Sequence, residues 1–233
     1  MYADYDLATT GRVISDPARA AMLLRMMDGQ AHTASDLARC AGVSASAASA
    51  HLRRLVDSRL VTVTVAGRRR LHTLSSAEVA SAIEALALVS PLLPVESLRQ
   101  AGTGSRLQIA RACYSHLGGQ LAVAITTELV GAGVVRAVAC GEQSAIGSLE
   151  HPLLRALHIT ALPRGSAPAA RGCQDWTERT PHLAGRLGSA LMAAMLEHGW
   201  LSRRPRDRAL TITERGTDQL GGIGVWPGRI AAS

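Results

Sequence analysis

Apolar residues recur with helical spacing near the start of the chain, where they predict a first helix. The stripe consists of Ala20, Leu23, Leu24 and Met27. It follows Asp16-Pro17, an N-cap acceptor and a proline whose fixed φ suits the first helical position. Gly29, which can adopt a positive φ, marks the end of this helix.

Two shorter helical patterns follow, separated by a tight turn. Thr33 and Asp36 have the spacing of a capping box and open a helix over residues 35–40. Residues 41–43 contain a glycine and turn the chain, and Ser44 then caps a helix that runs to about residue 58. Two helices joined by a glycine-containing turn predict a helix-turn-helix.

The last of these helices has one apolar face, formed by Ala48, Leu52 and Leu55, and one face of short and basic side chains. A helix with short side chains can enter the major groove, where base edges carry a distinct donor and acceptor pattern. We expect His51 to be partly buried rather than in contact with DNA. The residues that we assign to DNA binding on this helix are Ser44, Ala45, Ser46, Ser49, Ala50, Arg53 and Arg54.

A strand pattern follows the helices. Residues 60–65 alternate between apolar and polar, Ala66-Gly67 turns the chain, and residues 71–74 return. Arg68, Arg69 and Arg70 lie at the turn, and residues 50–72 hold six Arg against one Asp. An arginine run alone usually marks a solvated surface. On a hairpin after a helix-turn-helix it predicts a wing that contacts phosphates or the minor groove.

Composition and charge agree with this prediction. The chain has 233 residues and a net charge of +7, and every basic residue apart from histidine is Arg. A basic surface attracts polyanions, either nucleic acid or an anionic membrane face. We expect no transmembrane helix, no secretion signal and a cytoplasmic protein. The four cysteines are far apart in sequence and are expected to be free thiols: Cys40, Cys113, Cys140 and Cys173.

The N-terminal segments resemble the ArsR family of bacterial repressors. The matching stretches are residues 14–19, 35–38, 43–55 and 67–70. The resemblance implies a homodimer, a palindromic operator in double-stranded DNA contacted by the third helix, and repression that a ligand relieves. It also assigns the apolar helix predicted over residues 77–89 to the dimer interface.

The chain departs from this family at the known metal sites. Relatives often carry a Cys-x-Cys pair on the helix before the recognition helix, where this chain has only Cys40. Others use His and carboxylates after the wing, where this chain has Glu78 and Glu84 but no His or Asp. We therefore expect neither metal site. Ala50 stands where relatives often have His.

The second half of the chain contains an internal repeat. Residues 116–121 match residues 182–187, and the two copies span about 111–165 and 171–216. The second copy carries an insert over residues 176–181. Each copy predicts a helix, a glycine stop and a strand. Gly102-Thr103-Gly104-Ser105 is predicted to be a flexible joint between domains.

The predicted fold is mainly α with small β-wings (α+β). It comprises a winged helix-turn-helix DNA-binding and dimerisation domain over residues 1–95 and a duplicated helix–strand module over residues 103–221. The second half also resembles a longer actinobacterial branch of the ArsR family, which carries similar Cys-Tyr-x-His-Leu-x-Gly segments. That resemblance implies no particular effector.

The repeat supports four interpretations. We favour a packing role, in which the glycine of His-Leu-x-Gly admits a close helix and the histidine satisfies a carbonyl. Cys113 and His116 could share a helical face and bind metal with Cys173 and His182, but the second spacing is long, so we predict no metal and no cofactor. Arg111 and Arg171 could instead activate the thiols for redox sensing. The fourth interpretation is an effector pocket formed by Cys113, Tyr114, His116, Cys173, Trp176 and His182.

The predicted function is sequence-specific transcription regulation by a homodimeric repressor that a ligand or signal modulates at the C-terminal domain. The alternatives are a constitutive regulator whose second half is only structural, and a thiol- or metal-responsive sensor. We predict no enzyme, because the sequence shows no glycine-rich phosphate loop, no G-x-S-x-G motif and no carboxylate placed to orient a histidine.

Overall fold

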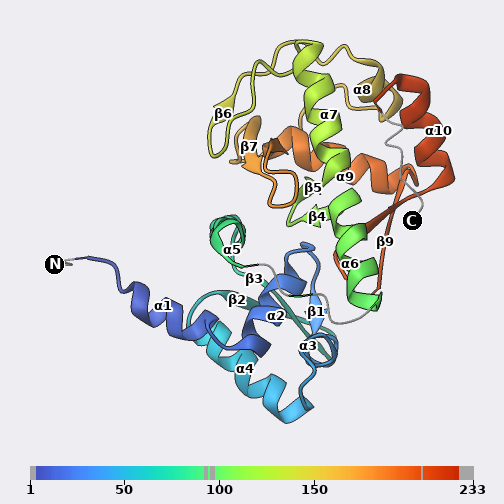
Figure 1. Ribbon diagram of the computed structural model, residues 1–233. Helices are drawn as coiled ribbons and strands as arrows, with labels where there is room; N and C mark the ends of the chain where they lie inside the picture. Colours follow the sequence, from blue (N-terminus) through green and yellow to red (C-terminus); the bar gives the residue numbers. More distant parts are fainter. Residues whose placement is uncertain (1–3, 92–93, 95–97, 206, 226–233) are drawn as a thin grey trace. The chain divides into compact units, whose positions relative to one another are not determined.

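The computed structural model of the chain describes residues 4–91, 94, 98–205 and 207–225. The chain divides into two compact units (Figure 1): the N-terminal unit, Met1–Leu86, and the C-terminal unit, Ala87–Ser233. The predicted flexible joint at residues 102–105 is wrong, because these residues lie inside a helix, Leu98–Ile109. There Ser105 Oγ donates to the Ala101 carbonyl and Arg106 donates to Thr103 Oγ1, contacts that help offset the poor helix propensity of glycine.

The N-terminal unit contains helices and one small antiparallel sheet, in which the strands lie in the order β1-β3-β2. The elements are α1 (Leu7–Ile14), α2 (Pro17–Met26), β1 (His32–Thr33), α3 (Ala34–Ala41), α4 (Ala45–Asp57), β2 (Val61–Ala66), β3 (Arg69–Leu74) and α5 (Ala77–Val89). This is the winged helix-turn-helix that the sequence predicts, with α3 and α4 as its two helices and β2–β3 as its wing.

The predicted helix starts are confirmed by their caps. Asp16 Oδ1 accepts from the Arg19 N–H at 3.0 Å, with Pro17 at the first helical position. Thr33 and Asp36 form the reciprocal capping box at the start of α3. Ser44 Oγ accepts from the Ala47 N–H at 3.2 Å and so caps α4. Each cap satisfies backbone groups that a helix end leaves without a partner.

The core of this unit forms where α2, α3 and α4 pack together beneath the sheet. Gly42, at a φ of +66°, ends α3 and provides the sharp turn into α4. The buried apolar side chains are Met22, Leu23, Met26, Met27, Leu37, Leu52, Leu55, Val61 and Leu74. Of the stripe predicted on α2, Leu23 and Met27 are buried, but Leu24 is 43% exposed, and Met22 and Met26 fill the core instead.

Asp28 organises the connection between α2 and the sheet. Its side chain is 6% exposed, forms an ion pair with Arg25 and lies 2.8 Å from His32 Nε2. Its Oδ1 also accepts from the Gln30 N–H at 2.9 Å. Although burial acts in the opposite direction, the hydrogen bonds from His32 and Gln30 lower the pKa of the Asp28 carboxyl.

We predict that Asp28→Asn lowers the free energy of unfolding at neutral pH by about 1.5–3 kcal/mol, because it leaves buried donors without a charged acceptor. Asp28 contributes this stability above its unfolded pKa, and the contribution disappears as pH falls through its lower folded pKa. Urea unfolding of the full chain should therefore show a difference that shrinks at acid pH. Asp57→Asn, at an exposed position of α4, is the control and should change stability little. An equal effect of the two substitutions would contradict this role.

The C-terminal unit is built from short strands and longer helices (Figure 1). Its sheets are β4-β5, β6-β7-β8 and β10-β9, all antiparallel. The elements are α6 (Leu98–Ile109), β4 (Arg111–Cys113), β5 (His116–Gly118), α7 (Gln120–Gly131), β6 (Gln143–Ser144), α8 (Pro152–Ala156), β7 (Ala170–Gln174), β8 (Pro181–Ala184), α9 (Gly185–Glu197), β9 (Leu201–Arg203), β10 (Leu210–Ile212) and α10 (Glu214–Ile223).

The internal repeat exists, and each copy contains the predicted helix and glycine stop: α7 with Gly133 and α9 with Gly199. In the second copy the predicted strand follows as β10. Each copy begins with a β-hairpin that leads into a helix: β4-β5-α7 in the first copy and β7-β8-α9 in the second. The helical interpretation of Cys113 and His116 is therefore wrong. Tyr114, with a φ of +59°, helps to turn the chain between β4 and β5. The strand predicted after the glycine stop of the first copy, at residues 155–160, is wrong, because α8 extends to Ala156.

The two copies exchange their packing partners. Helix α9 of the second copy packs against β5 of the first, and α7 of the first packs against β8 of the second. Thr126 Oγ1 on α7 accepts from the Leu183 N–H on β8 at 2.9 Å. Gly188 on α9 permits a close approach, because a Cβ there would lie 3.4 Å from the His116 side chain and 2.4 Å from the Leu183 carbonyl. The glycines of the predicted His-Leu-x-Gly packing role are instead Gly119 and Gly185, where a Cβ would lie 2.6 Å from the Gln108 carbonyl oxygen on α6 and 2.7 Å from the Pro168 carbonyl oxygen.

None of the described helices combines the length and apolar character that crossing a membrane requires.

Candidate functional site

The outer face of α4 is available to a partner. All seven residues assigned to it from the sequence are exposed. Ser44 and Ser46 share a hydrogen bond at 3.0 Å, and Ser49 Oγ donates to the Ala45 carbonyl at 2.9 Å. Hydroxyls bonded in this way keep acceptor capacity for an incoming donor. The opposite face is buried, so α4 is fixed in the unit while its short side chains face outward.

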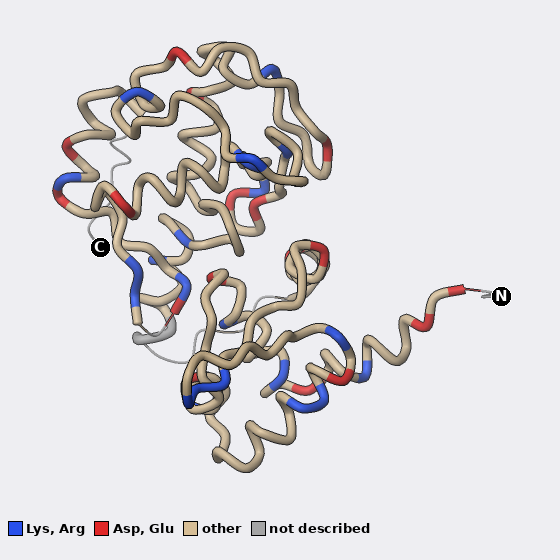
Figure 2. The backbone as a smooth tube through the Cα atoms, turned by 180° about the vertical axis from the view of Figure 1, so that it is seen from behind, with Lys and Arg blue, Asp and Glu red and all other residues tan. Residues whose placement is uncertain are grey.

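The wing presents three exposed arginines. Ala66 pairs with Arg69 and Val65 with Arg70, and Gly67 turns the chain at a φ of +61°. Arg68, Arg69 and Arg70 are all exposed. Figure 2 shows basic positions of the N-terminal unit on its helices and on the wing.

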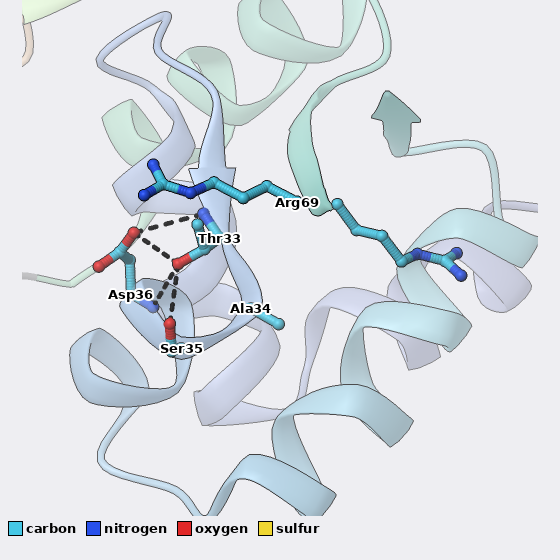
Figure 3. A pocket seen from close by; sticks show the side chains of 6 residues that line it. Thr33, Ala34, Ser35, Asp36 and Arg69 are labelled. Carbon is cyan, nitrogen blue, oxygen red and sulfur yellow. Dashed lines mark hydrogen bonds between the residues drawn. The ribbon is translucent and has the colours of Figure 1, made fainter. Parts of the chain in front are cut away.

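A hollow of about 590 Å³ lies between the wing and the start of α3. Figure 3 shows the side chains around it, with Thr33, Ser35 and Asp36 joined by hydrogen bonds at the start of α3. Its lining consists of Thr33, Ala34, Ser35, Asp36, Arg69 and Arg70. Arg69 and Arg70 therefore lie beside the start of α3, the first helix of the helix-turn-helix.

His51 is 20% exposed and faces the start of α2 rather than the outer surface of α4. Its Nδ1 lies 3.5 Å from Asp16 Oδ1 and 3.4 Å from the Arg19 guanidinium. This placement confirms the prediction of a partly buried helix residue.

A second candidate site lies inside the C-terminal unit, where the structure brings together two cysteines and two histidines. We call Cys113, His116, Cys173 and His182 the Cys–His cluster. Each offers one ligand atom, and these four atoms lie within 4.8 Å of one another. The sulfur atoms are 3.9 Å apart and the two Nε2 atoms are 3.1 Å apart. All four side chains are buried, with His182 and Cys113 fully enclosed.

Strand register creates the cluster. Cys113 pairs with His116 across the β4–β5 hairpin, and Cys173 pairs with His182 across β7–β8. Directly opposed residues on antiparallel strands have neighbouring side chains. Because β5 and β8 also lie side by side, the two pairs meet.

Asp175 supports the cluster from behind. Its Oδ2 accepts from the Gly119 N–H at 2.7 Å and lies 3.1 Å from His182 Nδ1 and 2.8 Å from the Arg111 guanidinium. Its Oδ1 accepts from the Thr177 hydroxyl and N–H. Asp175 and Arg111 are both fully buried, so their opposite charges form a closed ion pair.

The charges of the cluster depend on these contacts. Hydrogen bonds from Cys113 and the two histidines lower the pKa of Cys173 far below that of an ordinary thiol, although burial opposes this. Burial likewise opposes protonation of His182, but Asp175 and Cys173 raise its pKa to about 9. Burial lowers the pKa of His116. Contacts with His182 and Arg111 outweigh burial and hold the pKa of Asp175 well below its usual range.

The two remaining residues of the predicted effector pocket lie outside this group of ligand atoms. Tyr114 occupies the turn between β4 and β5 and is half-buried. The Trp176 ring covers the Arg111 guanidinium, which lies 4.7 Å from its centroid. Whether these residues line an effector pocket stays a prediction.

Sequence reasoning missed Asp175 and assigned Arg111 to thiol activation, whereas Arg111 pairs with Asp175. The expectation that no carboxylate orients a histidine is corrected by the contact between Asp175 and His182. A signal was present, because Arg111 precedes Cys113 by two residues and Asp175 follows Cys173 by two. Residues two apart on a strand share a face, so a strand interpretation would have grouped them.

Comparisons with known proteins concern both halves of the chain. The family model of a helix-turn-helix domain matches residues 14–64. The uncharacterized HTH-type transcriptional regulator YdfF of Bacillus subtilis (strain 168) is 36% identical over 212 residues, which are 91% of this chain and 93% of that protein.

Solved structures resemble a smaller part of the chain. Reduced HlyU from Vibrio cholerae N16961 is 26% identical with a TM-score of 0.33, over 37% of this chain and 90% of that one. The cadmium metal-sensor CMTR from Mycobacterium tuberculosis is 29% identical with a TM-score of 0.33, over 39% of this chain and 93% of that one.

Proposed function

Because the chain belongs to the family of HTH-type transcriptional regulators, we propose that it acts as a homodimeric repressor on a palindromic operator in double-stranded DNA. That relationship confirms the predicted role in transcription regulation, and the family model matches the predicted helix-turn-helix over residues 14–64. The observation that carries the proposal is the exposed outer face of α4, with short hydroxyl and basic side chains and a fully packed inner face. The operator, the dimer and repression are the parts proposed here.

Helix α4 would enter the major groove, and the wing would contact the backbone beside it. Short side chains allow the helix axis to approach base edges closely. Arginines on the wing would neutralise phosphates and supply affinity that depends on salt concentration. A regulator that acts on chromosomal DNA would work in the cytoplasm.

The dimer would form through α5 and α1. Of the thirteen residues of α5, all of which the structure describes, Ala80 alone is buried, although the helix is mostly apolar. Leu86 is 45% exposed on this helix. No residue of α1 is buried, and Leu7 at its start is 78% exposed. Apolar helices with so little buried surface favour a second copy as partner, because association would remove that surface from water.

Dimerisation also explains how the protein would recognise a palindrome. Two recognition helices related by a two-fold axis would contact half-sites about 34–36 Å apart, one turn of DNA. Modulation by a ligand or signal in the C-terminal unit is the regulatory part of the proposal. The alternative is a constitutive regulator, whose operator affinity would not change with any ligand that stabilises the C-terminal unit.

We predict that Arg68→Ala/Arg69→Ala weakens DNA binding and flattens its dependence on salt. Each lost phosphate contact should reduce the slope of log affinity against log salt by about 1, so the double variant should lose about 2. Fluorescence anisotropy on DNA from upstream of the gene measures both effects. Arg136→Ala/Arg164→Ala removes the same charge from exposed positions of the C-terminal unit and should leave the slope nearly unchanged. Equal slopes for the two variants would refute phosphate contact by the wing.

We predict that Leu86→Glu shifts the protein from dimer to monomer, because a charge in an apolar interface loses its hydration. Analytical ultracentrifugation across a concentration series measures the dissociation constant. Leu24→Glu is a matched control, since Leu24 is 43% exposed on α2, close to the 45% of Leu86. A protein that is monomeric before substitution, or a dimer that both variants weaken equally, would disprove this interface.

A further inference from the structure

We propose that the Cys–His cluster binds one Zn²⁺ ion, which joins the two copies of the repeat through Cys113, His116, Cys173 and His182. The sequence alone favoured a site without metal, because the two pairs have unequal spacings. The hairpin register removes that objection, since it places both pairs in the same geometry. The site lies in the C-terminal unit and differs from both family metal sites that this chain lacks.

The distances fit a tetrahedral ion. Zinc binds thiolate sulfur at about 2.3 Å and imidazole nitrogen at about 2.0–2.1 Å, so the tetrahedral edges are about 3.8 Å between sulfurs and about 3.3 Å between nitrogens. The observed separations are 3.9 Å between the sulfur atoms and 3.1 Å between the Nε2 atoms. Packing alone has no reason to direct two Nε2 atoms and two sulfurs at one point.

Asp175 lies where it favours the tautomer that a metal requires. Its Oδ2 lies 3.1 Å from His182 Nδ1, so the proton of the neutral imidazole belongs on Nδ1 and the lone pair on Nε2. That Nε2 is the atom that faces His116. A carboxylate behind a metal-binding histidine is a common arrangement, because it orients the ring and raises its basicity.

Charge balance favours the same conclusion. Two thiolates and Zn²⁺ sum to zero, and the buried Asp175–Arg111 pair also sums to zero. A neutral ion site surrounded by protein costs far less to bury than separate thiolates would. Because four protein ligands complete the coordination and all are buried, the ion would have a structural role rather than bind substrate.

Elemental analysis of the full-length protein tests the proposal directly. The protein is purified under reducing conditions with any histidine tag removed, and we expect about one zinc per chain. After a chelator has removed the zinc, added Co²⁺ should produce the intense visible bands of tetrahedral cobalt and a thiolate-to-cobalt charge-transfer band. A reduced protein that is purified without zinc and binds neither Zn²⁺ nor Co²⁺ would overturn the site.

Cysteine variants identify the ligands. Cys113→Ser and Cys173→Ser should each remove stoichiometric zinc and reduce the charge-transfer band. Cys40→Ser and Cys140→Ser alter the exposed cysteines and should leave both readouts unchanged. If the cluster variants do not fold, titration of metal-free wild-type protein still decides, since bound metal must protect Cys113 and Cys173 from alkylation while Cys40 and Cys140 react. Equal reactivity of all four with zinc present would overturn the assignment.

Asp175 is a positioning residue in this proposal and has its own test. Asp175→Asn should keep the thiolate-to-cobalt band, because all four ligands remain, and weaken zinc affinity by about 10–100-fold in competition with a chelating dye. An unchanged affinity would show that the carboxylate does not support the metal. None of these measurements uses DNA, so a failed metal site leaves the proposed operator binding intact.

Discussion

A single carboxylate, that of Asp175, ties the two halves of the C-terminal unit together. It belongs to the second copy of the repeat, yet it accepts the Gly119 N–H at the start of α7 and pairs with Arg111 on β4, both in the first copy. It also holds His182, on its own hairpin. Removing one partner of a buried charge pair typically costs about 3–5 kcal/mol, because the other charge stays buried without compensation. The Asp175 carboxylate thereby links the two hairpins that carry the Cys–His cluster.

The charge of the cluster depends on what lies at its centre. Without metal, hydrogen bonds lower the pKa of Cys173, and Asp175 together with Cys173 raises the pKa of His182 to about 9, so that His182 would be the positive partner of the thiol. A metal ion would occupy the same position and replace the proton as the positive partner. Metal binding should accordingly release protons, since zinc takes thiolates and neutral imidazoles as ligands. The exchanged packing of α7 and α9 encloses this centre on both sides, so its charge cannot be screened by water.

The sequence predicted the N-terminal unit well because local signals determine it. The caps at Asp16, Thr33 and Ser44, and the glycine at position 42, each act within a few residues. The C-terminal cluster was harder, since residues three apart can share a helix face or face each other across a two-residue hairpin. Cys113 and His116 have that spacing, and the apolar residues after them favoured the helix. The insert over residues 176–181 separates Cys173 from His182 in the sequence, so the second pair was not recognised. The same loop places Asp175 Oδ2 3.1 Å from His182 Nδ1.

The insert also touches the helix on which the dimer is proposed to depend. Arg179, within the loop between β7 and β8, donates to the Leu88 carbonyl near the end of α5 at 3.2 Å. The loop therefore has Asp175 at its start, the Arg179 contact near its end and His182 just beyond. Arg179 and Leu88 both belong to the C-terminal unit, so this contact ties the loop between β7 and β8 to the segment at which that unit begins.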